Sequence, residues 1–290
     1  MNIEDKFPKT LPKQHQNIQP GIESEMNPVP IYDLPEYHNN SKRLKGKVAV
    51  ITGGDSGIGR AVALAFAREG AKICIMYLNE HGDANLTKEL VEKSGSECLL
   101  ISGDIGCEEF CKNSISQVIK TFGAINILIN NAAEQHCVNK IEELTKEQLE
   151  RTFKTNFFSA VYLTKSAVSN MKKGDCIINN TSVVAYKGHE LLIDYSATKG
   201  ALTTFTRSMA ISLAKNGIRV NAVAPGPIWT PLIPSSFNED EVAKFGANTN
   251  LGRVGQPVEL AEAFVFLASQ GASYITGEVI HVNGGEIINA

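Results

Sequence analysis

The chain contains Thr52-Gly53-Gly54-Asp55-Ser56-Gly57-Ile58-Gly59-Arg60 between an apolar run at 48–52 and a helix-like run at 61–66. Gly53, Gly57 and Gly59 allow a tight turn and a close approach of the backbone to a pyrophosphate, because glycine has no Cβ and tolerates positive φ. The N-terminus of the following helix offers unpaired N–H groups and a favourable dipole to such an anion. A strand, a glycine-rich turn and a helix in this order predict a dinucleotide-binding site.

Short apolar runs that are rich in β-branched residues recur along the chain, with helix-length segments between most of them. The predicted strands are 48–52, 73–77, 98–101, 125–129, 176–180, 220–223 and 278–282. Continuous apolar strands that alternate with helices indicate a parallel sheet with helices on both faces. The predicted fold class is therefore α/β, a single doubly wound Rossmann domain with a parallel sheet of about seven strands.

The first 44 residues differ from the rest of the chain. They show no helical or strand periodicity and hold six prolines: Pro8, Pro12, Pro20, Pro28, Pro30 and Pro35. This composition predicts an extended proline-rich arm at 1–44 ahead of a domain at 45–290 that includes a lid at about 229–250. Because apolar side chains such as Met26 and Ile31 would be exposed in a free arm, residues 20–40 are predicted to strap onto the same or a neighbouring subunit. A disordered tail is the alternative.

Composition excludes several classes of function. The net charge of -3 gives no basic footprint for nucleic acid or an anionic membrane. The longest apolar runs, such as 73–78, are too short to span a bilayer, and the N-terminus has no apolar signal core. The six cysteines form no C-x-x-C pair and have no His cluster beside them, so reduced thiols and no metal site are expected. A cytoplasmic protein without nucleic-acid or membrane partners is predicted.

A second informative segment is Tyr195-Ser196-Ala197-Thr198-Lys199, which places a phenol and an ammonium four residues apart on a predicted helix. Residues at i and i+4 share a helix face, so both side chains can converge on one substrate atom. A positive charge about 5 Å from a phenol, at an effective dielectric near 20, lowers the phenol pKa by about two units. The pair is therefore predicted to act as a general acid/base, with an ordinary surface pair as the alternative.

Several motifs together resemble the short-chain dehydrogenase/reductase family over about residues 45–288. The glycine-rich turn resembles the family's T-G-x-x-x-G-x-G motif. Gly103-Asp104-Ile105 resembles the segment that flanks the adenine ring, and Asn130-Asn131-Ala132-Ala133 resembles N-N-A-G, with Ala133 in place of the usual Gly. Pro225-Gly226-Pro227-Ile228-Trp229-Thr230 resembles the loop that contacts the nicotinamide carboxamide. The proline-rich arm and Tyr77-Leu78-Asn79-Glu80 are typical of a bacterial glucose/ribitol-dehydrogenase-like, general-stress subgroup, which implies a homotetramer with one nicotinamide cofactor per subunit.

The resemblance also implies catalytic roles for Asn156, Ser182, Tyr195 and Lys199. Ser182 follows the predicted strand 176–180 and would hold the substrate oxygen opposite the phenol of Tyr195. Lys199 would lower the pKa of Tyr195 and bind the nicotinamide ribose. Asn156, in a helix predicted over 151–171, would hold a water that relays protons to Lys199.

The cofactor contacts implied by the resemblance are Gly53, Asp55, Ser56, Gly57, Ile58, Gly59, Tyr77, Leu78, Asn79, Asp104, Ile105, Asn131, Ala132, Ala133, Tyr195, Lys199, Pro225, Gly226, Ile228 and Thr230. An acidic residue after the second strand favours NAD, whereas an Arg nearby favours NADP. Neither signature is clean here, but no cation lies at Ser56, Tyr77 or Leu78. The sequence therefore favours NAD among the two NAD(P) forms and leaves dual use open.

The predicted function is an NAD(P)-dependent oxidoreductase that transfers hydride between the nicotinamide and an alcohol/carbonyl substrate, such as a sugar, a polyol or a small carbonyl compound. Substrate contacts are expected from three segments: Glu134-Gln135-His136, 184–192, and a lid at 229–247. Glu134 and Gln135 suit a polar substrate, and His136 and His189 are candidates for contact with it. The alternatives are a non-catalytic nicotinamide-cofactor sensor and an interaction protein that uses the arm.

Overall fold

The computed structural model of the chain describes residues 3–38 and 41–287. Residues 1–2 and 39–40 of the predicted arm, and residues 288–290 of the predicted domain, lie outside the described residues. Among the described helices, none combines the length and the apolar character that a bilayer span requires.

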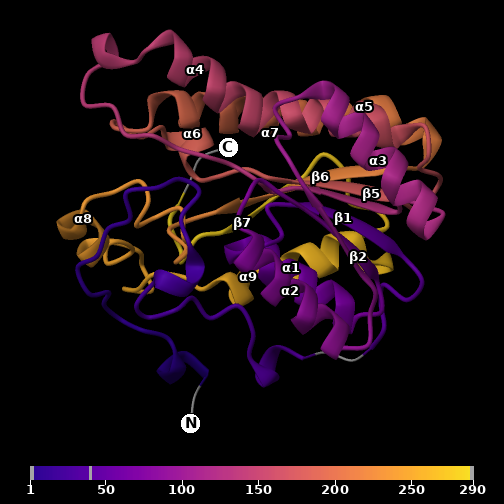
Figure 1. Ribbon diagram of the computed structural model, residues 1–290, viewed down its shortest axis with the longest axis horizontal. Helices are drawn as coiled ribbons and strands as arrows, with labels where there is room; N and C mark the ends of the chain where they lie inside the picture. Colours follow the sequence, from indigo (N-terminus) through magenta and orange to yellow (C-terminus); the bar gives the residue numbers. More distant parts are fainter. Residues whose placement is uncertain (1–2, 39–40, 288–290) are drawn as a thin grey trace.

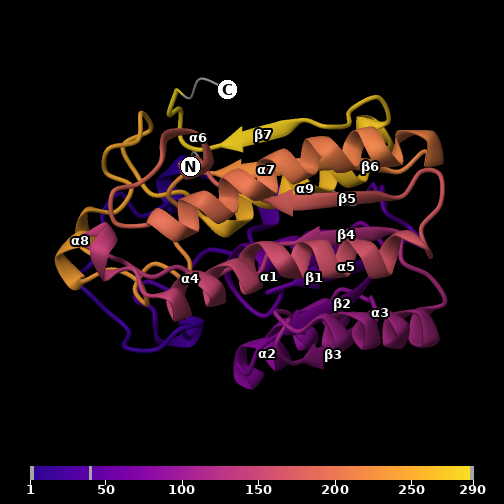
Figure 2. The same cartoon turned by 90° about the horizontal axis from the view of Figure 1, so that it is seen from above.

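Seven parallel strands form one sheet in the order β3-β2-β1-β4-β5-β6-β7. The strands are β1 (Val48–Thr52), β2 (Lys72–Tyr77), β3 (Cys98–Ser102), β4 (Ile127–Asn130), β5 (Cys176–Asn180), β6 (Arg219–Pro225) and β7 (Val279–Val282). The order reverses between β1 and β4, and ligands of such sheets bind beyond the carboxyl ends of the strands at this point. In Figure 2 the strand arrows point toward the side that carries α8 and the arm. The predicted fold class is confirmed.

Helices cover both faces of the sheet (Figure 1). One layer holds α1 (Gly57–Arg68), α2 (His81–Lys93) and α9 (Pro257–Ala268); the other holds α3 (Glu108–Phe122), α5 (Ser159–Val168) and α7 (Ile193–Leu213). Ala49 and Ile51 of β1 contact the first layer, whereas Val48 and Val50 contact the second. Because successive side chains of a strand point to opposite faces, a strand buried on both sides must be apolar at every position.

The predicted helix at 151–171 is wrong in its bounds and in its regularity. The structure has α4 (Lys146–Phe153), a π-helical turn (Lys154–Phe158) and α5 in direct succession. The helix begins earlier because the Thr145 side chain caps it, accepting a hydrogen bond from the N–H of Gln148 at 3.1 Å. The π-helical turn buries Thr155 and Asn156 beside the loop that follows β4. Such turns are frequent at functional sites.

The arm lies on its own chain, along the lid and the first helix layer (Figure 1). The indole N–H of Trp229 donates to the carbonyl of Pro28 at 2.7 Å. The N–H of Val258 donates to the carbonyl of Ile31 at 3.1 Å. Met26 is buried in the same apolar cluster as Trp229. Of the alternatives from sequence, the strap on the same subunit is confirmed, and the disordered tail is wrong for the described part of the arm.

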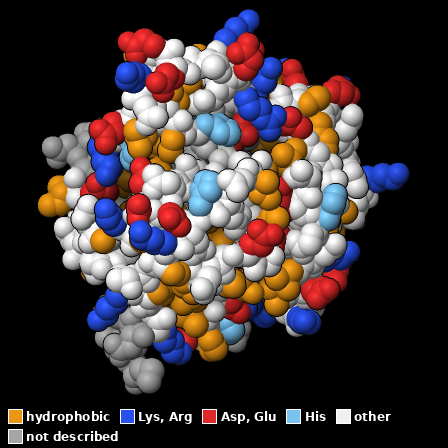
Figure 3. Space-filling view, turned by 60° about the vertical axis from the view of Figure 1, so that its left-hand side comes forward, with side chains coloured by type: hydrophobic (Ala, Val, Ile, Leu, Met, Phe, Trp, Pro, Cys, Tyr) orange, Lys and Arg blue, Asp and Glu red, His pale blue; other side chains and the backbone are white. Residues whose placement is uncertain are grey.

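The region predicted as a lid, at about 229–250, contains α8 (Glu239–Lys244) after a run of turns. Asn238 and Glu241 form a capping box at the start of α8. On the face that carries this region, Lys and Arg side chains are interspersed with Asp and Glu (Figure 3). No single sign of charge dominates that face.

All six cysteines are free thiols. Cys74, Cys98, Cys111 and Cys176 are buried, whereas Cys107 and Cys137 are exposed. Within the described ranges, no group of three or more His, Cys, Asp or Glu side chains is arranged to hold a metal ion.

Candidate active site

A cavity of about 500 Å³ lies at the carboxyl ends of the central strands, within the range of cofactor and ligand pockets. Most of the residues predicted from the sequence line it. They are Gly53, Asp55, Ser56, Gly57, Ile58, Tyr77, Leu78, Asp104, Ile105, Asn131, Ala132, Ala133, Ser182, Tyr195, Lys199, Pro225, Gly226, Ile228 and Thr230. The topology therefore brings six separate sequence motifs to one cavity.

Three predicted residues do not line this cavity: Gly59, Asn79 and Asn156. A Cβ at Gly59 would lie 1.9 Å from the carbonyl oxygen of Gly53, so this glycine lets α1 pack against the turn. Glu80 lines the cavity in place of Asn79. Asn156 is buried behind the cavity wall, where its side chain accepts a hydrogen bond from the backbone N–H of Glu134.

Asn131 holds the glycine-rich turn in shape. Its side-chain amide donates to the carbonyls of Thr52 at 2.9 Å and Gly53 at 3.1 Å, and its side-chain oxygen accepts from the Asn180 amide at 2.8 Å. Gly53 and Gly57 have positive φ values of 61° and 50°. A turn with glycine at these positions, followed by the start of α1, fits the pyrophosphate of a dinucleotide.

Tyr195 and Lys199 lie on α7, and both are buried. The Lys199 Nζ is 5.4 Å from the centroid of the Tyr195 ring and donates to the carbonyl of Asn180 at 2.7 Å. Ser182 follows β5 and forms a side-chain hydrogen bond with Tyr195. The structure thus brings these three predicted residues together at one wall of the cavity, and the surface-pair alternative is wrong.

The predicted electrostatics of this pair are wrong in direction. Burial raises the pKa of Tyr195 to about 12, and the hydrogen bond with Ser182 opposes this rise only in part. Burial also lowers the pKa of Lys199 to about 7. The prediction of a lowered Tyr195 pKa assumed a charged lysine in a medium of moderate dielectric. Removal of both groups from water disfavours the phenolate and the ammonium alike.

Asn156 holds the loop after β4. Its Oδ1 accepts from the N–H of Glu134 at 2.9 Å, and its Nδ2 donates to the Glu134 carbonyl at 2.8 Å and to the Thr198 hydroxyl at 3.2 Å. The side chain therefore fixes Glu134 beside the tyrosine helix. Both polar ends of the amide have protein partners, and the predicted role of Asn156 in holding a water stays a prediction.

Arg151 connects two parts of the cavity wall. Its guanidinium lies 2.5 Å from a carboxylate oxygen of Asp104 and 2.9 Å from one of Glu134. Asp104 belongs to the segment predicted beside adenine, and Glu134 to a segment predicted to touch substrate. The ion pairs therefore link these two segments through α4.

The three segments predicted to contact substrate all contribute to the cavity. Glu134, Gln135 and His189 line it, but His136 does not. From the lid, the lining side chains include Leu232, Ile233, Phe237, Lys244 and Phe245.

Sequence reasoning missed several lining residues, notably Glu80, Arg151, Thr155 and two residues of the arm, Pro20 and Gly21. Glu80 and Arg151 could have been found, because they lie next to segments that the motifs identify. The arm residues carry no such signal, since only the folded path of the arm brings them to the cavity.

The chain is similar to proteins of known family. The family model described as enoyl-(acyl carrier protein) reductase matches residues 53–286. General stress protein 39 of Bacillus subtilis (strain 168) is 58% identical over 97% of this chain and 98% of that protein. Glucose and ribitol dehydrogenase of Daucus carota is 49% identical over 96% and 98%. NADPH-dependent aldehyde reductase 1, chloroplastic, of Arabidopsis thaliana is 50% identical over 96% and 99%.

Solved structures share the fold. A short-chain dehydrogenase from Burkholderia cenocepacia J2315, in complex with NADP, has a TM-score of 0.79 and 26% identity, over 84% of this chain and 98% of that one. A 3-ketoacyl-(acyl-carrier-protein) reductase from Brucella melitensis, complexed with NADH, has a TM-score of 0.77 and 33% identity, over 83% and 98%. Both of these similar proteins hold a nicotinamide cofactor.

Proposed function

The chain belongs to the short-chain dehydrogenase/reductase family and is an NAD(P)-dependent oxidoreductase, and on this premise we propose that Tyr195 is its general acid/base and that it interconverts alcohols and carbonyl compounds. The observation that carries the proposal is the convergence of Ser182, Tyr195 and Lys199 on the cavity that the glycine-rich turn also lines. The non-catalytic sensor is not favoured, because a sensor needs no buried acid/base group beside the cofactor site.

The proposed chemistry uses groups that already lie in place. When bound, the nicotinamide supplies or accepts the hydride. Ser182 and Tyr195 hold the substrate oxygen between their hydroxyls, and Tyr195 gives the proton during reduction or takes it during oxidation. Lys199, 5.4 Å from the ring centroid, stabilises the charge that develops on the phenol oxygen when its proton leaves.

The residues that would hold the cofactor follow from the lining of the cavity. The turn from Gly53 to Ile58 would take the pyrophosphate, Asp104 and Ile105 the adenine, and the loop at Pro225, Gly226, Ile228 and Thr230 the nicotinamide amide. Asn131, Ala132 and Ala133 form the wall between these two ends. The fit is supported by Gly53 and Gly57, whose positive φ values of 61° and 50° form a tight turn without a Cβ ahead of α1.

We propose a preference for NAD over NADP. Among the described lining residues between 53 and 80, Asp55 and Glu80 are acidic, and none is Lys or Arg. This is the end of the cavity at the close of β2, where the adenosine ribose of a dinucleotide sits. The extra phosphate of NADP would be repelled there by two carboxylates. The name of the Arabidopsis relative favours the opposite choice, and a dissociation constant for NADP more than about tenfold below that for NAD would reverse our proposal.

The proposed substrate is a sugar, a polyol or another small carbonyl compound. Glu134 and Gln135 give the substrate end polar walls, while Leu232, Ile233 and Phe237 close it from the lid side. The name of the carrot relative points to the same class.

We also propose that the chain assembles as a homotetramer, as the family resemblance implies. The support is the exposure of large apolar side chains on the helices, including Ile211 on α7 at 80% and Phe158 at 37%. Sedimentation that gave the mass of a single 31.4 kDa chain would contradict this. The cytoplasmic location, the division of the chain at residue 44 and the lid at about 229–250 stay predictions.

The test of the proposed function is the change in nicotinamide absorbance with NAD and with NADP, across sugars, polyols and small aldehydes and ketones. We expect turnover with at least one member of this panel and a faster reaction with NAD. Tight cofactor binding without turnover on any of these compounds would revive the sensor alternative.

A further inference from the structure

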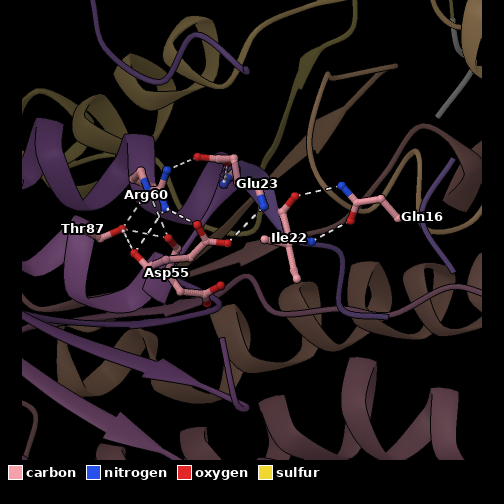
Figure 4. A network of polar contacts seen from close by, with 8 residues as sticks. Gln16, Ile22, Glu23, Asp55, Arg60 and Thr87 are labelled. Carbon is pink, nitrogen blue, oxygen red and sulfur yellow. Dashed lines mark hydrogen bonds and ion pairs between the residues drawn. The ribbon is translucent and has the colours of Figure 1, made fainter. Parts of the chain in front are cut away.

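Glu23 reaches from the arm to the glycine-rich turn (Figure 4). Its side chain is fully buried. One carboxylate oxygen accepts from the N–H of Gly57 at 2.5 Å, and the other pairs with the guanidinium of Arg60. The N–H of Glu23 donates to a carboxylate oxygen of Asp83 at 3.0 Å. Glu23 therefore touches the turn, α1 and α2 at once.

Arg60 holds the other side of the same turn. Its Nε donates to the carbonyl of Asp55 at 3.0 Å and to the hydroxyl of Thr87 at 2.8 Å, and that hydroxyl also donates to the Asp55 carbonyl at 2.8 Å. The ring of Tyr32, from the arm, lies 4.9 Å from the Arg60 guanidinium. The turn is thus held at the N–H of Gly57 by Glu23 and at the carbonyl of Asp55 by Arg60.

The same part of the arm borders the cavity. Pro20 and Gly21 line it, and the Gln19 side chain donates to the carbonyl of Gln135 at 2.7 Å and accepts from its N–H at 2.8 Å. The Gln16 side chain closes the arm on itself by two hydrogen bonds to the backbone of Ile22. Residues 16–23 therefore connect the loop after β4, at Gln135, to the glycine-rich turn, at Gly57.

We propose that Glu23 is a positioning residue for the cofactor, which holds the glycine-rich turn in the shape that receives the pyrophosphate. Glu23 lies outside the family match, which spans residues 53–286. A buried carboxylate is costly unless donors satisfy it, and both oxygens of Glu23 face donors on the turn and its helix. Apolar contacts alone would dock the arm without placing a charge there.

The groups around Glu23 act on its pKa in opposite directions. Burial raises the pKa of Glu23 to about 7, while Arg60 and the Gly57 N–H oppose the rise and the carboxylates of Asp83 and Asp55 add to it. An acceptor that binds two donors in a buried site gains strength from its charge. The contact therefore depends on Arg60, the one cation that faces Glu23 among these groups.

The test compares Glu23→Ala with Glu25→Ala in the full-length protein. Both residues belong to the same short 3-10 turn, but Glu25 is exposed. The probe is NAD(H), with its dissociation constant measured by calorimetry and by nicotinamide fluorescence. We expect the constant to rise about tenfold or more in Glu23→Ala and to stay within about twofold of wild type in Glu25→Ala. Turnover at saturating cofactor should stay within about twofold of wild type in Glu25→Ala, because Glu25 does not line the cavity.

Two further measurements keep the proposal testable if Glu23→Ala is poorly folded. Glu23→Gln keeps an oxygen for the Gly57 N–H but loses the charge, so its dissociation constant should lie between those of wild type and Glu23→Ala. In the wild-type protein, NAD(H) should slow amide hydrogen exchange of residues 16–28, because coupling between two sites is reciprocal. Unchanged cofactor affinity in a folded Glu23 variant, or unchanged exchange in the arm, would overturn the proposal. These experiments measure cofactor binding, so their outcome does not depend on whether Tyr195 is the general acid/base.

Discussion

The Nζ of Lys199 lies 5.4 Å from the centroid of the Tyr195 ring, and both side chains are buried in the wall of the same cavity. Burial moves the two pKa values apart, with that of Tyr195 raised to about 12 and that of Lys199 lowered to about 7. In the protein without ligands, the neutral phenol and the neutral amine are therefore the favoured forms above neutral pH.

Lys199→Met tests the lowered pKa of Lys199 through stability. Between about pH 7 and 10 the unfolded chain keeps the lysine proton and the folded chain does not, so the lysine makes wild type more stable as pH rises. The unfolding free energy of wild type minus that of Lys199→Met should increase by up to about 1.4 kcal/mol per pH unit in this window. Denaturant titrations at pH 7.5 and 9 measure it. A difference that does not change with pH would show that Lys199 is charged in the folded protein.

Asn156→Ala tests whether the hydrogen bonds of this side chain hold the loop after β4 in place. The variant leaves the N–H and the carbonyl of Glu134 without their side-chain partner, so the free energy of unfolding should fall by about 1–3 kcal/mol. Turnover should fall by about tenfold or more, because the loop lines the substrate end. Asn170→Ala, at an exposed site just beyond α5, is the matched control and should stay within about 0.5 kcal/mol of wild type. Equal stability of the two variants would contradict this role.

Gly59→Ala tests the close approach of α1 to the turn. The added Cβ would meet the carbonyl oxygen of Gly53 at 1.9 Å, so the helix or the turn must shift. We expect a loss of about 1–3 kcal/mol in unfolding free energy and at least a tenfold weaker binding of NAD(H). In Gly82→Ala the new methyl group meets nothing within 4 Å on α2, and the variant should gain about 0.4–1 kcal/mol. Normal cofactor binding by Gly59→Ala would show that the turn tolerates displacement.

The sheet could be predicted from the sequence because each strand is a short apolar run that can be recognised by itself. β1 is apolar at four successive positions that face alternate helix layers, and its bounds match the prediction. The Tyr195 and Lys199 pair was also predictable, since helical spacing alone places both side chains on one face. Their pKa values were not, because burial depends on packing that local spacing does not contain.

The π-helical turn and the contacts of the arm could not be predicted from the sequence. Nothing in the composition of residues 154–158 distinguishes a π-helical turn from a regular helix, yet this turn places Asn156 against Glu134. The Glu23 carboxylate accepts a hydrogen bond from the N–H of Gly57, which lies 34 residues further along the chain. Prolines predicted an extended arm, but only the folded chain shows which backbone groups it reaches.

The central claim is that Tyr195 is the general acid/base, and Tyr195→Phe tests it most directly. The variant removes one hydroxyl from a buried ring, so NAD(H) should bind within about twofold of wild type while turnover falls by about 100-fold to 10,000-fold. Tyr274→Phe, at a fully exposed tyrosine, is the control and should keep full activity. Single-turnover hydride transfer, followed by nicotinamide absorbance, is the measurement. The loss in Tyr195→Phe with intact cofactor binding is the predicted result, and activity within about twofold of wild type would contradict the account.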